Sequence, residues 1–166
     1  CLPCVPGSFQ SNWGAGFCEP CASGYYTADY GSILCRPCGM GQFQNISAQI
    51  DCGVCGVGTY TASYGSTNCT ACAMGKYSMQ GSKACRLCPA GTFAIEQDGS
   101  TEECSNCPTG TTSATGQATC TNCSAGSHNP LAGGVCTACP VGSFSAVQRA
   151  TMCEACTAGT ITEDTG

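Results

Sequence analysis

Apolar side chains in this 166-residue chain form no long runs, and rings recur at a regular interval. A ring lies two residues after a glycine at intervals of about 17 residues from Phe9 to Phe93, and again at Phe144. No segment places apolar residues at helical spacing over about eleven residues, so helices are not expected. Short runs such as Thr59-Tyr60-Thr61 predict minimal strands. The pattern therefore predicts turns and coil with short β-structure and almost no helix.

The cysteine spacing shows that one unit is repeated ten times. All 20 cysteines belong to C-x-x-C pairs that start 16 to 19 residues apart. A glycine follows the second cysteine by three residues in every unit, a ring follows that glycine in seven units, and another glycine often precedes the next pair by four residues. The units begin at Cys1, Cys18, Cys35, Cys52, Cys69, Cys85, Cys104, Cys120, Cys136 and Cys153. This self-similarity predicts one continuous array over residues 1–166, in which contacts run between neighbouring units.

Each repeated position has a physical interpretation. The first glycine is expected at a turn with positive φ, which other residues adopt at a cost. The ring is expected to cover a disulfide, and so is the single tryptophan, Trp13. Three units lack the ring and carry Thr112, His128 or Ile161 nearby instead. The sequence therefore does not predict how these three units pack.

Composition limits the size of any apolar core. Leu, Ile, Val and Phe together number 20, as many as the cysteines, and form about 12% of the chain, well below the ~20% that marks chains short of core-forming residues. Disordered chains share this shortage, but they usually carry high net charge, whereas only 9% of these residues are charged. An α/β enzyme domain, a helical bundle and a coiled coil are therefore not expected. The sequence favours a small disulfide-rich fold without a central core, elongated like a rod.

Charge and hydropathy limit the kinds of molecule that this chain is expected to bind. The net charge is −5, and the five basic residues are scattered, so neither nucleic acid nor an anionic membrane is an expected partner. No apolar run approaches the ~20 residues of a membrane span, and no signal peptide is present. Because the chain opens on Cys1 inside a motif, we expect it to be a piece of a longer protein whose secretion signal or anchor lies elsewhere.

Near-identical units restrict the disulfide pairing to three schemes. In the first scheme, each C-x-x-C closes on itself. In the second, the second cysteine of one unit joins the first cysteine of the next. In the third, units pair two by two, as in Cys1–Cys18 with Cys4–Cys21. Self-closure resembles redox motifs, whose bonds are labile when exposed, and pairing two by two predicts a difference between odd and even units that the sequence lacks. We favour the second scheme, in which each bond closes a loop of about 15 residues and contributes about 3 kcal/mol.

This scheme leaves Cys1 and Cys156 to partners beyond the chain. The nine predicted bonds are Cys4–Cys18, Cys21–Cys35, Cys38–Cys52, Cys55–Cys69, Cys72–Cys85, Cys88–Cys104, Cys107–Cys120, Cys123–Cys136 and Cys139–Cys153.

A family resemblance is carried by the pattern C-x-x-C-P-x-G-[TS]-[FY]. It occurs as CRLCPAGTF from Cys85 and as CTACPVGSF from Cys136. The pattern resembles ephrin-receptor-like cysteine-rich repeats and is similar to the first module of tumour-necrosis-factor-receptor cysteine-rich domains. Such repeats occur in receptor ectodomains and in long arrays of surface and appendage proteins, including the mastigonemes of flagella. The resemblance implies a secreted, disulfide-bonded ectodomain, and no ligand site carries over from it.

Other chemistry was weighed for the cysteines and acids. Two neighbouring C-x-x-C pairs approach the spacing of a four-cysteine zinc ribbon, but the unbroken array and the acidic balance argue against metal. A thioredoxin-like role needs a βαβ unit, which is absent from the predicted structure. His128 is the only histidine and is interpreted as a packing substitute for the ring. Four acids gather in the longest unit, where a solvated loop is favoured over a Ca²⁺ site; they are Glu96, Asp98, Glu102 and Glu103. No cofactor and no enzymatic activity are expected.

Three N-x-[ST] sequons predict covalent glycans on surface loops of a secreted protein. The acceptor residues are Asn45, Asn68 and Asn122. Glycans would help to solubilise a chain that has few charges of its own.

Monotonous repetition without a distinct site favours a structural role, as part of an extracellular filament, stalk or cell-surface appendage. Its expected partners are copies of itself or other filament and surface proteins. The alternative is a receptor or adhesion ectodomain that binds a protein ligand along its side. That alternative needs atypical units, and the candidates are those from Cys104 to Ser127 and from His128 to Val135.

Overall fold

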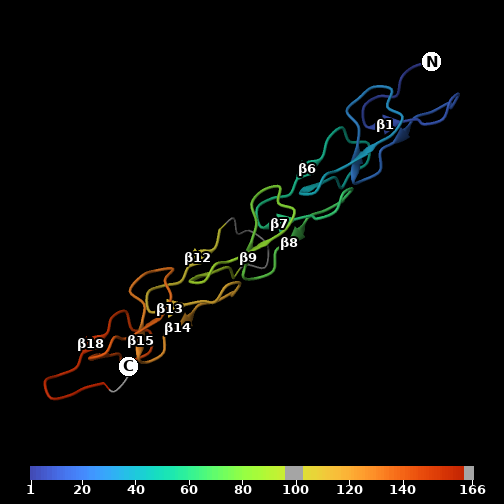
Figure 1. Ribbon diagram of the computed structural model, residues 1–166. Coiled ribbons are helices and arrows are strands. Elements are labelled where there is room, and N and C mark those ends of the chain that lie inside the picture. The colour runs from blue at the N-terminus through green and yellow to red at the C-terminus, as the bar shows by residue number, and fades with distance from the viewer. Residues whose placement is uncertain (96–102, 163–166) are drawn as a thin grey trace. The chain divides into compact units, whose positions relative to one another are not determined.

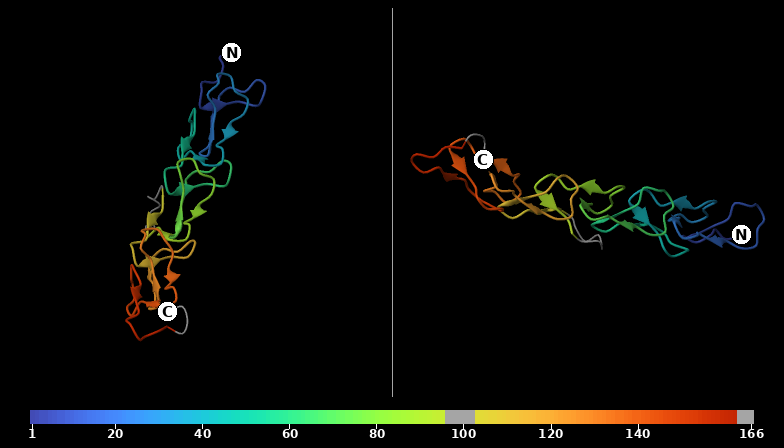
Figure 2. Two further views of the ribbon diagram at one scale, coloured as in Figure 1. Left: turned by 60° about the vertical axis from the view of Figure 1, so that its left-hand side comes forward. Right: turned by 90° about the horizontal axis from the view of Figure 1, so that it is seen from below.

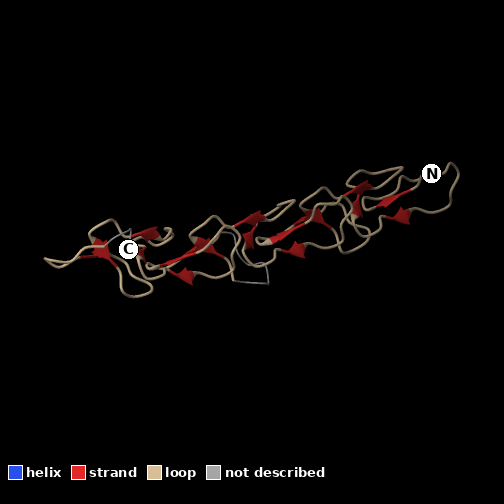
Figure 3. Cartoon of the chain, turned by 60° about the horizontal axis from the view of Figure 1, so that its bottom comes forward, coloured by secondary structure: helices blue, strands red, loops and turns tan. Residues whose placement is uncertain are grey.

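The computed structural model describes residues 1–95 and 103–162. Within these ranges the chain contains turns, loops and two-residue strands, and no helix (Figure 3). The prediction of a small, disulfide-rich tandem array with almost no helix is confirmed. No described helix is long or apolar enough to cross a membrane.

In the described residues the strands form nine antiparallel hairpins, each joining the end of one unit's turn to the C-x-x-C of the next. The pairs are β1 (Ser8–Phe9) with β2 (Glu19–Pro20), β3 (Tyr25–Tyr26) with β4 (Arg36–Pro37), β5 (Gln42–Phe43) with β6 (Gly53–Val54), β7 (Thr59–Tyr60) with β8 (Thr70–Ala71), β9 (Lys76–Tyr77) with β10 (Arg86–Leu87), β11 (Thr92–Phe93) with β12 (Ser105–Asn106), β13 (Thr111–Thr112) with β14 (Thr121–Asn122), β15 (Ser127–His128) with β16 (Thr137–Ala138), and β17 (Ser143–Phe144) with β18 (Glu154–Ala155).

The repeats divide into two compact units. The first contains Cys1–Cys72 and Ser78–Cys85, and the second contains Ala73–Tyr77 with the described residues of 86–95 and 103–162. Within the first unit the hairpins follow one another in sequence order, from blue β1 to green β7 and β8 (Figure 1). The same short hairpins recur in the second unit (Figure 2).

Two glycine turns shape each repeat. Val5-Pro6-Gly7-Ser8 is a four-residue turn closed by the Ser8 amide, which donates to the Val5 carbonyl at 3.1 Å. Gly7 at its third position has φ of 81°, the left-handed conformation that a type II turn requires. The second turn has the same character, as at Gly81 with φ of 72°. The expected positive φ of the first glycine is therefore observed.

The first glycines also let repeats two apart come into contact. A Cβ built on Gly7 would lie 2.2 Å from the carbonyl oxygen of Ala48, which is two repeats away. Gly24 stands in the same relation to Gly65, at 2.1 Å. Only a residue without Cβ permits this approach of two backbones. The prediction that contacts run only between neighbouring units is wrong, because equal spacing along the chain does not reveal how successive hairpins overlap.

The close approach gives a test of the packing. Gly24→Ala and Gly14→Ala both place a side chain at positive φ, 84° and 75°, but only Gly24 faces a backbone carbonyl, whereas no atom lies within 4 Å of a Cβ on Gly14. The shared backbone strain costs about 1–2 kcal/mol. We expect Gly24→Ala to lower the thermal midpoint clearly more than Gly14→Ala does, as followed by circular dichroism. Equal shifts would show that the contact between repeats two apart contributes nothing.

Candidate functional site

The repeating element of this chain is a joint built around the second cysteine of each C-x-x-C pair. Cys21 donates its backbone N–H to the Gly7 carbonyl of the preceding repeat at 2.9 Å, and its carbonyl accepts from the Ala48 amide of the following repeat at 2.8 Å. Its side chain is bonded to Cys35, the first cysteine of that following repeat. One buried residue thus connects three successive repeats through all of its polar and covalent groups.

The nine disulfides follow the second of the three pairing schemes. They join Cys4–Cys18, Cys21–Cys35, Cys38–Cys52, Cys55–Cys69, Cys72–Cys85, Cys88–Cys104, Cys107–Cys120, Cys123–Cys136 and Cys139–Cys153. Eighteen cysteines are therefore unavailable as thiolates for the zinc ribbons considered above. The remaining two are free: Cys1 is exposed and Cys156 is half-buried.

The two cysteines of each bond have different surroundings. The second cysteine of a pair is at most 7% exposed in all nine bonded cases, whereas its partner in the next repeat is half-buried or exposed. Together with one small residue per repeat, these buried sulfurs are the core of the chain. The only other buried apolar side chain in the described residues is Ala94.

Sequence analysis missed the second component of this core, the residue that directly follows the ring. It is buried and polar in six repeats, as Thr27, Thr61, Ser78, Ser113, Asn129 and Ser145. Its polar group is always hydrogen-bonded. Ser78 Oγ donates to the Thr59 carbonyl at 3.0 Å, and Asn129 Nδ2 donates to the Thr111 carbonyl of the preceding repeat at 2.7 Å. The signal was present in the sequence, since a small or polar residue follows the ring in every repeat, but such residues are usually interpreted as surface.

The structure also places the predicted turn and ring residues. Gly133 has φ of 76° although it lies one residue nearer to the next cysteine than the pattern expects, and Ala48 and Arg149 adopt φ of 59° and 66° at the equivalent turn.

The rings themselves are half-buried or, at Phe144, just exposed. Trp13 is completely exposed, so the prediction that it covers a disulfide is wrong. The indole belongs to the loop that connects β1 to β2.

The three predicted glycan acceptors are all exposed. Asn45 lies in the loop after β5, Asn68 immediately precedes Cys69, and Asn122 is the second residue of strand β14. No hydrogen bond ties the Asn45 side chain to the described residues of the chain. Of the predicted acidic cluster, Glu96, Asp98 and Glu102 lie outside the described residues, and Glu103 is exposed.

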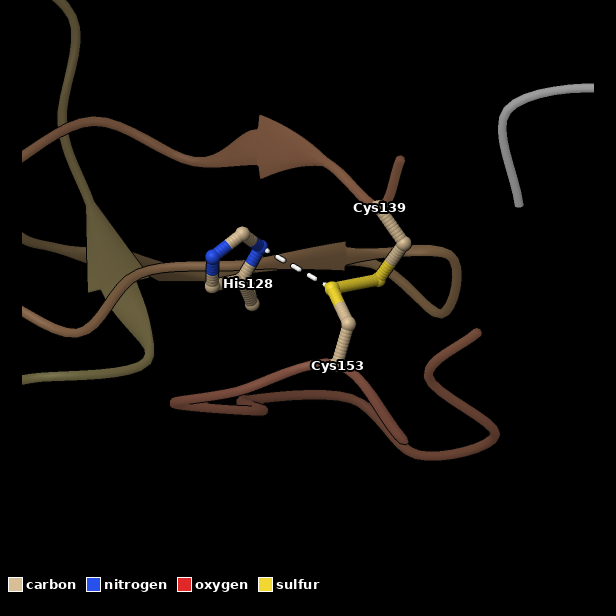
Figure 4. Close-up of side chains that lie close together, drawn as sticks. All are labelled: His128, Cys139 and Cys153. Atoms are coloured by element: carbon tan, nitrogen blue, oxygen red, sulfur yellow. Dashed lines mark hydrogen bonds between the residues drawn. A yellow bond between two sulfur atoms is a disulfide. The ribbon is translucent and has the colours of Figure 1, made fainter. Parts of the chain in front are cut away.

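His128 is brought to a disulfide, as its position in the ring slot suggests. Its Nδ1 lies 3.1 Å from Sγ of Cys153, which is bonded to the buried Cys139 (Figure 4). The imidazole comes from strand β15, whereas Cys139 precedes β17 and Cys153 directly precedes β18. Since a disulfide sulfur carries no hydrogen, the ring nitrogen is the donor.

Two open hollows lie on the first unit. One has a volume of about 480 Å³ and is lined by Tyr30, Ile33 and Leu34 with an exposed ion pair, in which Arg36 Nη2 lies 3.6 Å from Asp29 Oδ2. The other is about 420 Å³ and includes Leu2 and Phe17. The first hollow also contains the hydroxyls of Thr27 and Ser32, whose oxygens are 2.6 Å apart, and the second contains the free Cys1.

Comparison with known protein families decides the identity of the repeats. The sequence profile described as tyrosine-protein kinase ephrin type A/B receptor-like matches residues 1–34, 24–72, 75–114 and 132–166. The chain belongs to this family. The four matches cover most of the residues, so the resemblance seen in the C-x-x-C-P-x-G motif is confirmed over the array.

Membership of the ephrin-receptor-like family, together with nine disulfides, indicates an extracellular domain, because such bonds persist in oxidising compartments. A comparison with curated proteins found no match. The family and the structure together show a disulfide-rich repeat array and indicate an extracellular domain.

The buried slot after the ring gives a reciprocal test. Ser78→Ala removes the donor to the Thr59 carbonyl, and we expect it to lower the free energy of unfolding by about 1 kcal/mol. Ala94 occupies the same slot one repeat later, and its carbonyl accepts from Gly75 as the Ser78 carbonyl accepts from Gly58. Ala94→Ser is expected to be neutral or stabilising, since it supplies the missing donor. Denaturant midpoints of both variants measure this, and destabilisation by Ala94→Ser alone would contradict it.

Proposed function

We propose that this chain is a structural segment of an extracellular filament, stalk or cell-surface appendage. The observation that carries the proposal is the unbroken covalent path through the disulfides. From Cys4 to Cys153 each bond leads to a C-x-x-C step, and the next bond follows immediately. Tension applied to the ends runs along this short path and leaves unloaded the loops between bonded cysteines, which are 13 to 16 positions apart in the sequence. Such a chain transmits force without unravelling.

The same proposal accounts for the absence of a single dominant site in the described residues. From Cys21 to Cys139 each buried cysteine donates its backbone N–H to a glycine carbonyl of the preceding repeat, so length can be added by repetition without a change of local design. Partners of this segment are then copies of itself or other filament and surface proteins. Glycans at Asn45, Asn68 and Asn122 would cover exposed polar loops.

Native material provides the test of this function. An antibody against the oxidised chain should label ordered fibres or stalks in electron micrographs of the source cells, and a density map of those fibres should contain the hairpin repeat. Recovery of the chain only as a monomer that holds one soluble protein partner would contradict the proposal and support the alternative below.

Force spectroscopy tests the covalent path directly. The Cα atoms of Cys21 and Cys35 are 5.7 Å apart, and the C-x-x-C step adds at most about 11 Å. A repeat of the oxidised chain should therefore extend to about 17 Å, against about 60 Å for its 17 residues after full reduction. We expect the maximal extension to rise three- to fourfold on reduction. An oxidised chain that extends as far as the reduced one would exclude this path.

Glycosylation should be unequal among the three acceptors. Asn45, Ile46 and Ser47 are all exposed and lie outside strands, whereas Asn122 is in β14 and its sequon contains the buried Cys123. We expect site occupancy, measured by glycopeptide mass spectrometry of secreted material, to be highest at Asn45. Asn45→Gln should remove the corresponding mass without changing the fold. Unmodified Asn45 in material that carries glycan at Asn122 would contradict the prediction.

A receptor or adhesion ectodomain remains the second candidate because of one observation. Large apolar side chains are exposed on the first two repeats, notably Trp13, Phe17, Tyr30 and Ile33. Aromatic side chains of this kind are enriched among residues that dominate protein–protein binding. This candidate would place the ligand on repeats one and two, and not only on the repeats from Cys104 to Val135 to which the sequence pointed.

A further inference from the structure

One disulfide differs chemically from the other eight. His128 is the only imidazole in the chain, and it occupies the slot that holds Phe or Tyr in seven other repeats. Its Nδ1 donates to Sγ of Cys153 over 3.1 Å. Phenyl and phenol rings offer no nitrogen ligand, so only the Cys139–Cys153 bond has a metal-binding nitrogen in this slot.

The three side chains already converge on one point. One ligand atom from each of His128, Cys139 and Cys153 can be chosen so that all three lie within 4.8 Å of one another (Figure 4). Tetrahedral Zn²⁺ with two thiolates and one imidazole needs its sulfurs about 3.7 Å apart, given Zn–S bonds of about 2.3 Å. Opening the disulfide requires only that the sulfurs separate to this distance, which side-chain rotation supplies.

The surrounding backbone remains tied when the bond opens. The Cys139 amide donates to the Gly126 carbonyl at 2.8 Å, and the Asn129 amide donates to the Ala150 carbonyl at 3.0 Å. The hairpin β17–β18 pairs Phe144 with Glu154 directly beside Cys153. These hydrogen bonds, together with the disulfide of the preceding repeat, Cys123–Cys136, keep the three ligand residues near one another when this one bond opens.

We propose that His128, Cys139 and Cys153 form a thiol-gated site for a soft divalent cation such as Zn²⁺. The site is closed while the disulfide is intact and opens on reduction. A low-molecular-weight dithiol transfers two electrons and two protons to the sulfur–sulfur bond, which gives two cysteine thiols, and the dithiol becomes a cyclic disulfide. The cation then displaces both thiol protons into solvent and binds Nδ1 through its lone pair, with the ring proton on Nε2.

Exposure decides how the reagents reach this site. Cys139 is completely buried, whereas Cys153 and His128 are half-buried. Reductant and cation therefore approach from the side of Cys153. Three protein ligands leave a fourth position of the cation for water or another solvent ligand, as in zinc sites that are not purely structural.

Co²⁺ is the probe for this site because its tetrahedral thiolate complexes absorb visible light. The oxidised full chain is treated with limiting dithiothreitol, freed of reductant under anaerobic conditions, and titrated with Co²⁺. Alkylation and peptide mass spectrometry identify which cysteines have opened. We expect one Co²⁺ per chain, with the reduced Cys139 and Cys153 protected from alkylation by the metal, and no binding before reduction.

His128→Phe is the matched variant, because Phe fills the same slot in four other repeats and should preserve the fold. We expect it to bind Co²⁺ at least tenfold more weakly after the same reduction, and Cys139→Ser with Cys153→Ser to abolish binding. Equal affinity in His128→Phe would overturn the proposal. So would loss of the chain's circular dichroism signal before this disulfide opens, since the site would then never exist in folded protein.

Discussion

The bond from a buried second cysteine to the first cysteine of the next repeat is the constraint on which the whole chain depends. Hairpins of two residues per strand are too short to be stable alone, and the chain has almost no apolar core. Each bond closes a loop that would otherwise sample many conformations, a gain of about 3 kcal/mol in the chain-entropy model. The second cysteine, which forms the bond, is also among the most buried residues of its repeat, so the covalent link and the packing are provided by the same residue.

The remaining features serve this joint. The first glycine turns the chain so that its carbonyl accepts from the next buried cysteine, as Gly7 does from Cys21, and its lack of a side chain admits the turn from two repeats ahead. The polar residue after the ring satisfies backbone carbonyls that a larger apolar residue would leave without a donor. Each repeat contains its own buried residues, so the surface residues need few charges and can vary. Exposed residues such as Trp13 are therefore tolerated.

The sequence predicted the parts of the structure that depend on spacing along the chain. Equal intervals between C-x-x-C pairs led to the disulfide scheme, to the glycine with positive φ and to the absence of helices in the described residues. Features that depend on how hairpins stack were not predictable in this way. Periodicity says that repeats are alike, but it does not say that Gly7 meets Ala48 or that Thr61 is buried beside Ser66. The prediction for Trp13 was wrong because a large ring is usually covered, whereas the loop between β1 and β2 leaves this one exposed.

The proposed structural role depends on the joint between repeats more than on any one side chain, and the disulfide partners are therefore the decisive observable. Proteolysis of the native, unreduced chain at acidic pH, followed by mass spectrometry, measures them directly. The account predicts nine linked peptides in which the second cysteine of each repeat is joined to the first cysteine of the next, as in Cys21–Cys35 and Cys107–Cys120. Bonds within single C-x-x-C pairs, or a majority of free thiols, would contradict it.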